Sequence, residues 1–188
     1  MILRTALLIA AALAASSAVA APKPAPHKAA PAAKAAAPPA RVAPASGGPA
    51  DTRDPATFIA VFDAAGAKAQ TAHKEADSVL VAVTSTFATF SVQYAGCDPA
   101  GKACRAAVLD SQVAGTPTLV QLNSFNQASA MCRGYVDKVG KAHVSMSMML
   151  FADDTRAHLV MELAAWQGCI ADFAGFAKDP VAYLASAP

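Results

Sequence analysis

The spacing of the β-type segments limits the fold more than any other feature of the sequence. These segments are rich in β-branched and aromatic residues, are bounded by Ser, Thr and Gly, and follow one another at hairpin-length connections. Parallel strands need crossover helices between them, and only one helix, at 117–129, interrupts the series. An antiparallel sheet of five strands is therefore predicted. The expected strands are 79–83, 88–94, 105–113, 131–137 and 142–151.

The first and last helices carry the clearest helix signals. Asp54 can cap the free N–H groups of the first helix, Pro55 suits its first position, and Gly66 suits the left-handed turn that ends it. The last helix follows the acidic and capping residues 153–155 and runs to about residue 177. Its apolar residues recur at steps of three and four, which predicts one buried face. That face consists of Leu159, Leu163, Trp166, Ile170, Phe173 and Ala177.

The middle helix and the strand patterns complete the expected architecture. The helix at 117–129 begins with Pro117 as its first helical residue. It is expected to bury Leu119, Leu122 and Phe125. Apolar and polar residues alternate along the expected strands, so one face of the sheet packs and the other meets water. The predicted class is α+β, an antiparallel five-stranded up-and-down sheet packed with helices in the order α-β-β-β-α-β-β-α.

The N-terminal residues have the three parts of a secretory signal. Arg4 precedes an apolar run at 6–15, and an Ala-x-Ala pattern ends at Ala20. A membrane anchor is the alternative, but a span needs roughly 20 apolar residues and this run is shorter. Residues 1–20 are therefore predicted to be a signal peptide cleaved near Ala20. The mature protein is then periplasmic or secreted, with no transmembrane span left.

Residues 21–50 have the composition of a solvated spacer. They contain eight prolines, thirteen alanines, four Lys or Arg and no acid, with almost no large apolar surface to bury. One interpretation is a tether, and the other is a basic strip attracted to anionic lipid or polymer at an envelope surface. Residues 51–188 have the length of one domain. They hold ten Lys or Arg against thirteen Asp or Glu, a net charge of −3, so no cationic face is expected for a nucleic acid.

The four cysteines are an even set in a chain that is expected to be exported, where thiols are oxidised. Cys97 and Cys104 flank a turn between two expected strands, so a disulfide across the hairpin mouth is predicted. Cys132 and Cys169 can join the fourth strand to the last helix, and the sequence leaves this second bridge open. Metal binding is the alternative use of cysteine, but no CxxC pair or neighbouring His supports it.

Two asparagines stand near the end of the middle helix. Asn123 and Asn126 flank Phe125, and no titratable side chain lies beside them in sequence to form a catalytic set. Their amides are expected to satisfy carbonyl and N–H groups that the helix end leaves unpaired, and so to connect the helix to the sheet. The histidines lie far apart in sequence, and no nucleophile, phosphate-loop or dinucleotide motif occurs. No catalytic centre, metal or cofactor is predicted.

Three short motifs, in a fixed order, carry a family resemblance. They are residues 98–104 after the Gly-Cys that ends a strand, residues 122–126, and residues 133–137 followed by a Gly. This order resembles the YbjN family of proposed bacterial sensory transduction regulators, over nearly all of residues 54–177. The resemblance implies a fold similar to type III secretion chaperones, which cradle segments of other proteins. The motif positions with an expected structural role are Asn123, Phe125, Asn126, Arg133, Tyr135, Asp137 and Gly140.

The predicted function is non-enzymatic. We expect a regulatory or binding module of the cell envelope whose partner is an unidentified protein or peptide. Met149 is expected on the surface that contacts this partner, because thioether side chains adapt easily to different partners. The alternative is a structural envelope protein attached through its basic, proline-rich spacer. The oligomeric state does not follow from the sequence.

Overall fold

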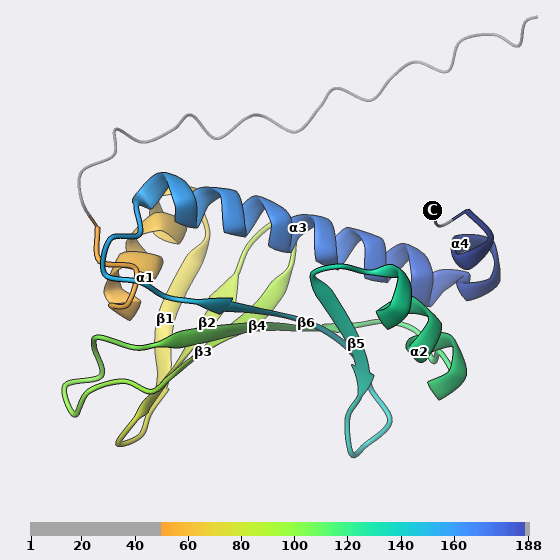
Figure 1. The fold of residues 1–188 in the computed structure, drawn as a ribbon, viewed down its shortest axis with the longest axis horizontal. Coiled ribbons are helices and arrows are strands. Elements are labelled where there is room, and N and C mark those ends of the chain that lie inside the picture. Colours follow the sequence, from red (N-terminus) through yellow and green to blue (C-terminus); the bar gives the residue numbers. More distant parts are fainter. Residues whose placement is uncertain (1–49, 187–188) are drawn as a thin grey trace, which may run out of the picture. The chain divides into compact units, whose positions relative to one another are not determined.

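A computed structural model describes residues 50–186 and has an α+β architecture, with six antiparallel strands and four helices. The predicted signal peptide and all but the last residue of the predicted spacer lie outside the described residues. The strands stand in the order β1-β2-β3-β4-β6-β5, and α3 runs across one face of the sheet (Figure 1). The strands are β1 Lys68–Lys74, β2 Ser78–Thr84, β3 Thr89–Ala95, β4 Ala106–Val113, β5 Cys132–Val136 and β6 Ala142–Met149. The helices are α1 Pro55–Ala64, α2 Leu119–Ala128, α3 Arg156–Lys178 and α4 Pro180–Ser186.

The capping signals of the first and last helices are confirmed. The Asp54 side chain accepts a hydrogen bond from the backbone N–H of Ala56 at 3.0 Å, and Pro55 is the first residue of α1. Thr155 caps α3 in the same way by accepting from the N–H of His158. All six residues of the predicted stripe on α3 are buried against the sheet. Burial of this stripe fixes α3 over the strands, since each large apolar side chain contributes about 1.5–3 kcal/mol when it leaves water.

The prediction of five strands is wrong, because β1 and the short helix α4 were not expected. β1 reads KAQTAHK, and all its side chains but one are exposed. It is an edge strand, so it needs no apolar alternation and leaves no periodic signal in the sequence. α4 buries none of its residues and likewise lacks an apolar stripe.

The up-and-down order of the last two strands is also wrong. β6 pairs with β4 over its full length, while β5 pairs with β6 at the edge of the sheet. Helix α2 connects β4 to β5, which does not pair with β4. Strand β6 then fills the position between β4 and β5. The central position suits β6 because Ala142, Val144 and Met146 bury one of its faces in the core.

The start of α2 differs from its prediction. The helix begins at Leu119, with Thr118 as N-cap in a capping box with Gln121, so Pro117 precedes the cap and is itself buried. Leu119, which was expected in the core, is 75% exposed because it lies in the first turn on the solvent side. Leu122 and Phe125 are buried, as predicted. Among the described residues, no helix has the length and apolar character needed to span a membrane.

Candidate functional site

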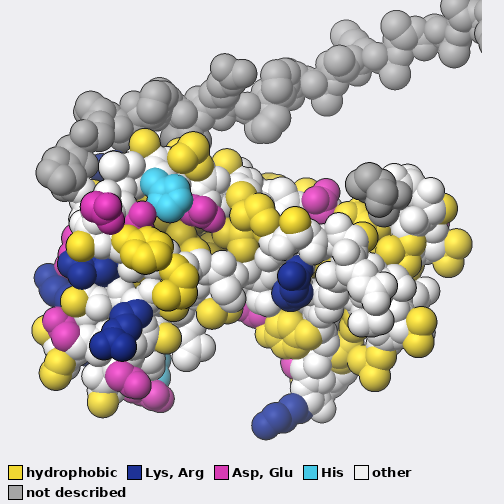
Figure 2. Space-filling model, viewed as in Figure 1, with side chains coloured by type: hydrophobic (Ala, Val, Ile, Leu, Met, Phe, Trp, Pro, Cys, Tyr) yellow, Lys and Arg dark blue, Asp and Glu magenta, His cyan; other side chains and the backbone are white. Residues whose placement is uncertain are grey.

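None of the helices in residues 50–186 packs on one face of the sheet, and the side chains of that face define the open face (Figure 1). Along β2, β3, β4 and β6 the buried residues alternate with partly or fully exposed ones, and the strand register places the exposed residues on the same side. In Figure 2 the lower outline of the molecule is hollowed between its two hairpin-bearing ends. The open face consists of Lys68, Gln70, His73, Ser78, Leu80, Ala82, Thr84, Thr89, Ser91, Gln93, Ala95, Ala106, Val108, Asp110, Gln112, Arg133, Tyr135, His143, Ser145, Ser147 and Met149.

The open face is poor in charge. Across β2 to β6, only Asp110, Arg133 and His143 on this face can carry a full charge near neutral pH, and β1 adds Lys68 and His73 at one margin. Small and hydroxyl side chains fill its centre, and Tyr135 and Met149 stand near its margins with 41% and 60% exposure. Depletion of charge together with exposed aromatic and Met side chains is typical of the centre of protein–protein interfaces.

A polar network joins the three strands at one end of the open face. Tyr135 and His143 are cross-strand neighbours, and their rings stack with centroids 5.1 Å apart. Both reach Asp110 on β4: the Tyr135 hydroxyl donates to Oδ2 at 2.6 Å, and His143 Nδ1 lies 2.8 Å from Oδ1. His143 Nε2 lies 3.5 Å from a carboxylate oxygen of Asp137. The network therefore ties β4, β5 and β6 together through side chains as well as through the backbone ladder.

The electrostatics of this network keep Tyr135 as a hydrogen-bond donor. Burial, the hydrogen bond to Asp110 and the negative charges of Asp110 and Asp137 all raise the pKa of the Tyr135 hydroxyl well above its ordinary value. Backbone N–H groups of Lys141 and Val139 lower the pKa of Asp137, although burial opposes them. Asp137 thereby stays ionised next to His143 and closes the β5–β6 turn.

The Asp110–His143 pair has the orientation of a carboxylate and a general base, but its surroundings differ from those of a catalytic pair. His143 Nε2, the atom that would take a proton, is shielded from solvent and turned toward Asp137. A general base must reach the proton of a substrate or nucleophile within about 3 Å. Among residues 50–186, no three Cys, His, Asp or Glu side chains converge as a metal-binding group.

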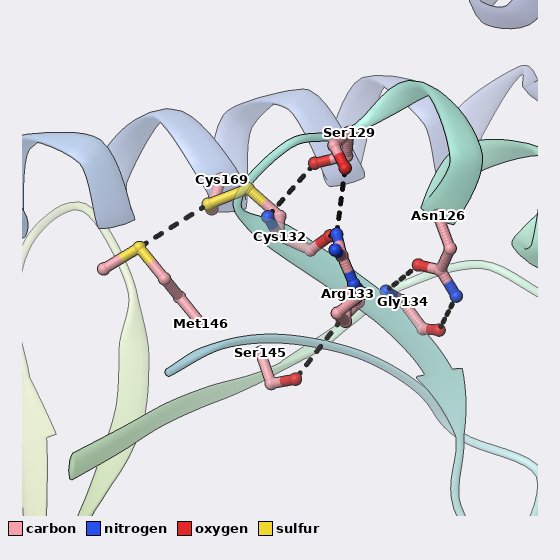
Figure 3. The surroundings of a disulfide bond; sticks show 8 residues. All are labelled: Asn126, Ser129, Cys132, Arg133, Gly134, Ser145, Met146 and Cys169. Carbon is pink, nitrogen blue, oxygen red and sulfur yellow. Dashed lines mark hydrogen bonds between the residues drawn. A yellow bond between two sulfur atoms is a disulfide. The ribbon is translucent and has the colours of Figure 1, made fainter. Parts of the chain in front are cut away.

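Both cysteine pairs form disulfides. Cys97–Cys104 closes the β3–β4 turn, and Cys132–Cys169 joins β5 to α3 (Figure 3). The second bridge, which the sequence had left open, is buried and lies beside Met146, whose sulfur is 3.9 Å from Cys169 Sγ. Disulfides of this kind are typical of proteins that fold outside a reducing cytoplasm.

The two asparagines of α2 have different surroundings. The Asn126 amide accepts from the N–H of Gly134 at 2.7 Å and donates to its C=O at 3.0 Å, so it pairs with both backbone groups of one residue of β5 (Figure 3). Its partners lie on the strand rather than on the end of its own helix. Asn123 is exposed, and its side chain has no hydrogen bond within the described residues.

The remaining motif residues are divided between two places. Phe125 packs in the core against Phe173, while Arg133 donates to the backbone carbonyls of Ser129 and Cys132 at the junction of α2 and β5. Gly140 adopts a positive φ of 82° in the β5–β6 turn. Tyr135 and Asp137 belong to the network on the open face, and Met149 lies on the same face.

Sequence reasoning missed Asp110 and His143, which complete that network. They are 33 residues apart in the chain, and only the pairing of β4 with β6 brings them together. The one available signal was their place at polar positions of alternating strands.

A second histidine, His158 of α3, lies 3.0 Å from Asp154, which precedes the helix, and 3.3 Å from Glu162. Asp154 also accepts from Thr52, so this group attaches the segment before α1 to the start of α3.

No family model, curated protein or solved structure matches the chain.

Proposed function

We propose that this chain is an exported, non-enzymatic protein-binding domain whose open face receives a partner protein or peptide. The observation that carries the proposal is the composition of that face inside its β1 margin: the eighteen outward-facing side chains of β2 to β6 include only three that can be fully charged. A sheet face that only meets water gains solubility from charged side chains. A face that must become dry on binding avoids them, because each buried unpaired charge opposes association.

The size and stiffness of the open face support the same role. Six strands spaced about 4.8 Å apart and about 20–25 Å long present an area of about 600 Å², close to the ~800 Å² that each partner buries in a standard interface. The network of Asp110, Tyr135 and His143 holds one end of this face in a single arrangement. A surface that is already ordered loses less conformational entropy on binding.

The export and the family relationship are part of the proposal. The N-terminal signal pattern and the two disulfides support a periplasmic or secreted location. The order of the sequence motifs supports a relationship to the YbjN family, and a one-sided sheet agrees with the chaperone-like cradle which that resemblance implies. The regulatory role would then be exerted through the bound partner.

Site-specific photocrosslinking in the native envelope tests the open face. A photoreactive phenylalanine analogue in place of Ser147 is expected to give a discrete adduct, and the same analogue in place of Met161, which is 63% exposed on α3, is the matched control. Val108→Arg, at the neighbouring position of β4, is expected to abolish the Ser147 adduct while the melting temperature stays within about 2 °C. Equal adducts from both positions, or an adduct that survives Val108→Arg, would argue against the proposal.

The alternative function is envelope attachment through the basic spacer, with the folded domain as a cap. Its support is the charge pattern of residues 21–50, which hold four Lys or Arg and no acid. Deletion of residues 22–49 separates the two functions. The open-face adduct should persist in the deleted chain if the domain binds the partner, and envelope association should disappear if the spacer provides the attachment.

A further inference from the structure

The two edges of the sheet differ in whether their outward-facing backbone groups are already hydrogen-bonded. At the β5 edge, the Asn126 side chain occupies both the N–H and the C=O of Gly134, so the backbone donor and acceptor that a further strand would use at this residue are already paired. At the β1 edge, Lys68–Lys74 pairs with β2 on one side, and no backbone hydrogen bond of these residues on the other side occurs within the described part of the chain. β1 therefore offers free donors and acceptors to an additional strand.

The charge of this edge restricts what can pair with it. β1 carries Lys68, His73 and Lys74 and no acid, while residues 51–188 as a whole have a net charge of −3. Neither lysine lies within 4 Å of a carboxylate in the described residues. Lys74 Nζ donates to the carbonyl of Ala100 at 2.7 Å, which leaves two of its three N–H groups free. Glu75 lies just beyond the strand, 3.3 Å from His73.

Two obvious occupants are excluded by this charge pattern. A second copy paired through its own β1 would bring together two strands that each carry two lysines and no acid, and this like-charge repulsion opposes the pairing. The chain's own residues 21–50 are basic, without a single acid, and their eight prolines lack the N–H that a ladder requires. An acidic segment meets neither obstacle.

The surroundings of β1 provide a place for an apolar side chain of the incoming strand. A cleft of about 170 Å³ lies between α1 and β1, with Ile59 on the helix side, Thr71 on the strand side and Lys74 at its rim. The cleft is open to solvent, its volume is that of about one large side chain, and Pro55, Ile59 and Val79 give it an apolar part. The register shift between Thr71 and His73 confines the regular part of the edge to residues 68–71 and 73–74.

We propose that the β1 edge binds an extended, acidic segment of another protein as a seventh antiparallel strand. The backbone of residues 68–74 forms the new ladder. An acidic side chain at one end of the segment meets Lys74 on the helix-covered face, an acidic side chain at the other end meets Lys68 on the side of the open face, and an apolar residue on the helix-covered face enters the cleft beside Ile59. The proposed ladder uses the backbone edge of β1, which adjoins one margin of the open face but does not use the centre of that face, so the inference does not depend on the proposed function.

A labelled peptide tests the proposal with the full chain. The probe is acetylated, amidated Asp-Thr-Ile-Thr-Val-Glu, whose two acids point to opposite faces of the added strand and whose Ile shares the face of Asp, and the comparison peptide has Lys at both ends in place of the two acids. The acidic peptide is expected to bind at least about tenfold more tightly in fluorescence anisotropy, because its two end charges attract the lysines rather than repel them. At saturation, hydrogen exchange of backbone amides in residues 68–74 should slow by about tenfold or more, since a ladder bond protects an amide and a diffuse charge contact does not.

Variants of matched charge complete the test. Lys68→Glu/Lys74→Glu should reverse the preference between the two peptides, and Lys138→Glu/Lys141→Glu, which makes the same charge change in the β5–β6 turn, should leave it within about twofold. If the double variant is unstable, Lys68→Glu alone should partly reduce the preference for the acidic peptide, because Lys68 has no side-chain hydrogen bond within the described residues.

Equal binding of both peptides, or unchanged exchange in residues 68–74 at saturation, would overturn the proposal. Val108→Arg on the open face should leave peptide binding intact, so the two surfaces can fail independently.

Discussion

Replacement of Asn126 by Ala removes the side chain that joins α2 to β5. Two neutral hydrogen bonds to Gly134, at 2.7 and 3.0 Å, are lost together. Each contributes about 0.5–1.5 kcal/mol net, so the free energy of unfolding should fall by about 2 kcal/mol. The site is half-buried, and water can partly replace the amide, which holds the loss near this value rather than at the full cost of two buried unpaired groups.

Thermal unfolding followed by circular dichroism measures this loss. For a domain of this size, each kcal/mol lowers the melting temperature by about 3–5 °C, so Asn126→Ala should melt about 6–10 °C lower than the parent chain. Asn123→Ala is the matched control, because it makes the same substitution one turn earlier on the exposed side of the helix. Its melting temperature should change by no more than about 2 °C.

Asn126→Asp separates the two hydrogen bonds. A carboxylate can still accept from the N–H of Gly134 but repels its C=O, so this variant should be destabilised at neutral pH and should recover part of its stability in acid, where the protonated carboxyl can donate. A melting temperature for Asn126→Ala within 1 °C of the parent, or an equal loss for Asn123→Ala, would refute the assignment of the Asn126 amide as the link between helix and strand.

Two further perturbations test the packing and the electrostatics. Gly134→Ala places a Cβ against the ring of Phe173 and 3.0 Å from Leu122 Cδ2. This overpacking should cost about 1–3 kcal/mol, measured by denaturant unfolding, and an unchanged midpoint would show that Phe173 can move aside without cost. For Asp154, burial alone would raise the pKa, but hydrogen bonds from the N–H of Phe151, from Thr52 and from His158 outweigh it and hold the pKa below its ordinary 3.8. Because the pKa of Asp154 is lower in the folded state, its contribution to stability is complete above about pH 4 and is lost as the pH falls through the folded pKa. Asp154→Asn should therefore flatten the dependence of the unfolding free energy on pH below about pH 4. A dependence as steep as that of the parent chain would assign the acid sensitivity to other carboxylates.

The elements that could be predicted are those whose burial and ends follow from a local pattern in their own residues. The stripe on α3 and the Asp54–Pro55 start of α1 are local patterns, and both were confirmed. β1 could not be predicted, because an edge strand exposed on nearly every side chain has no alternation to reveal it. The position of β6 between β4 and β5 was missed for a different reason. Hairpin-length connections indicate which strands are neighbours in sequence, but not whether a helix such as α2 carries the chain past a vacant position.

The candidate site was predicted only in part, because its members meet through strand register. Tyr135 and Asp137 were recognised as motif residues, yet their partners Asp110 and His143 come from other strands. A pair of residues 33 positions apart gives no sequence signal until β4 and β6 are aligned. The disulfide across the short β3–β4 turn was predictable because its loop is local, whereas Cys132–Cys169 depended on the place of β5 under α3.

The motifs that suggest a family relationship have a structural explanation, which limits what they can say about partners. Three separate links meet at one corner of the fold: the Asn126–Gly134 pair, the Phe125–Phe173 contact and the Cys132–Cys169 bridge. Each joins two of the elements α2, β5 and α3, so the residues of the second and third motifs are largely occupied in holding this corner. Apart from Arg133 and Tyr135, the open-face side chains lie outside these motifs. A related chain could therefore keep the corner and the fold while it changes the surface that selects the partner.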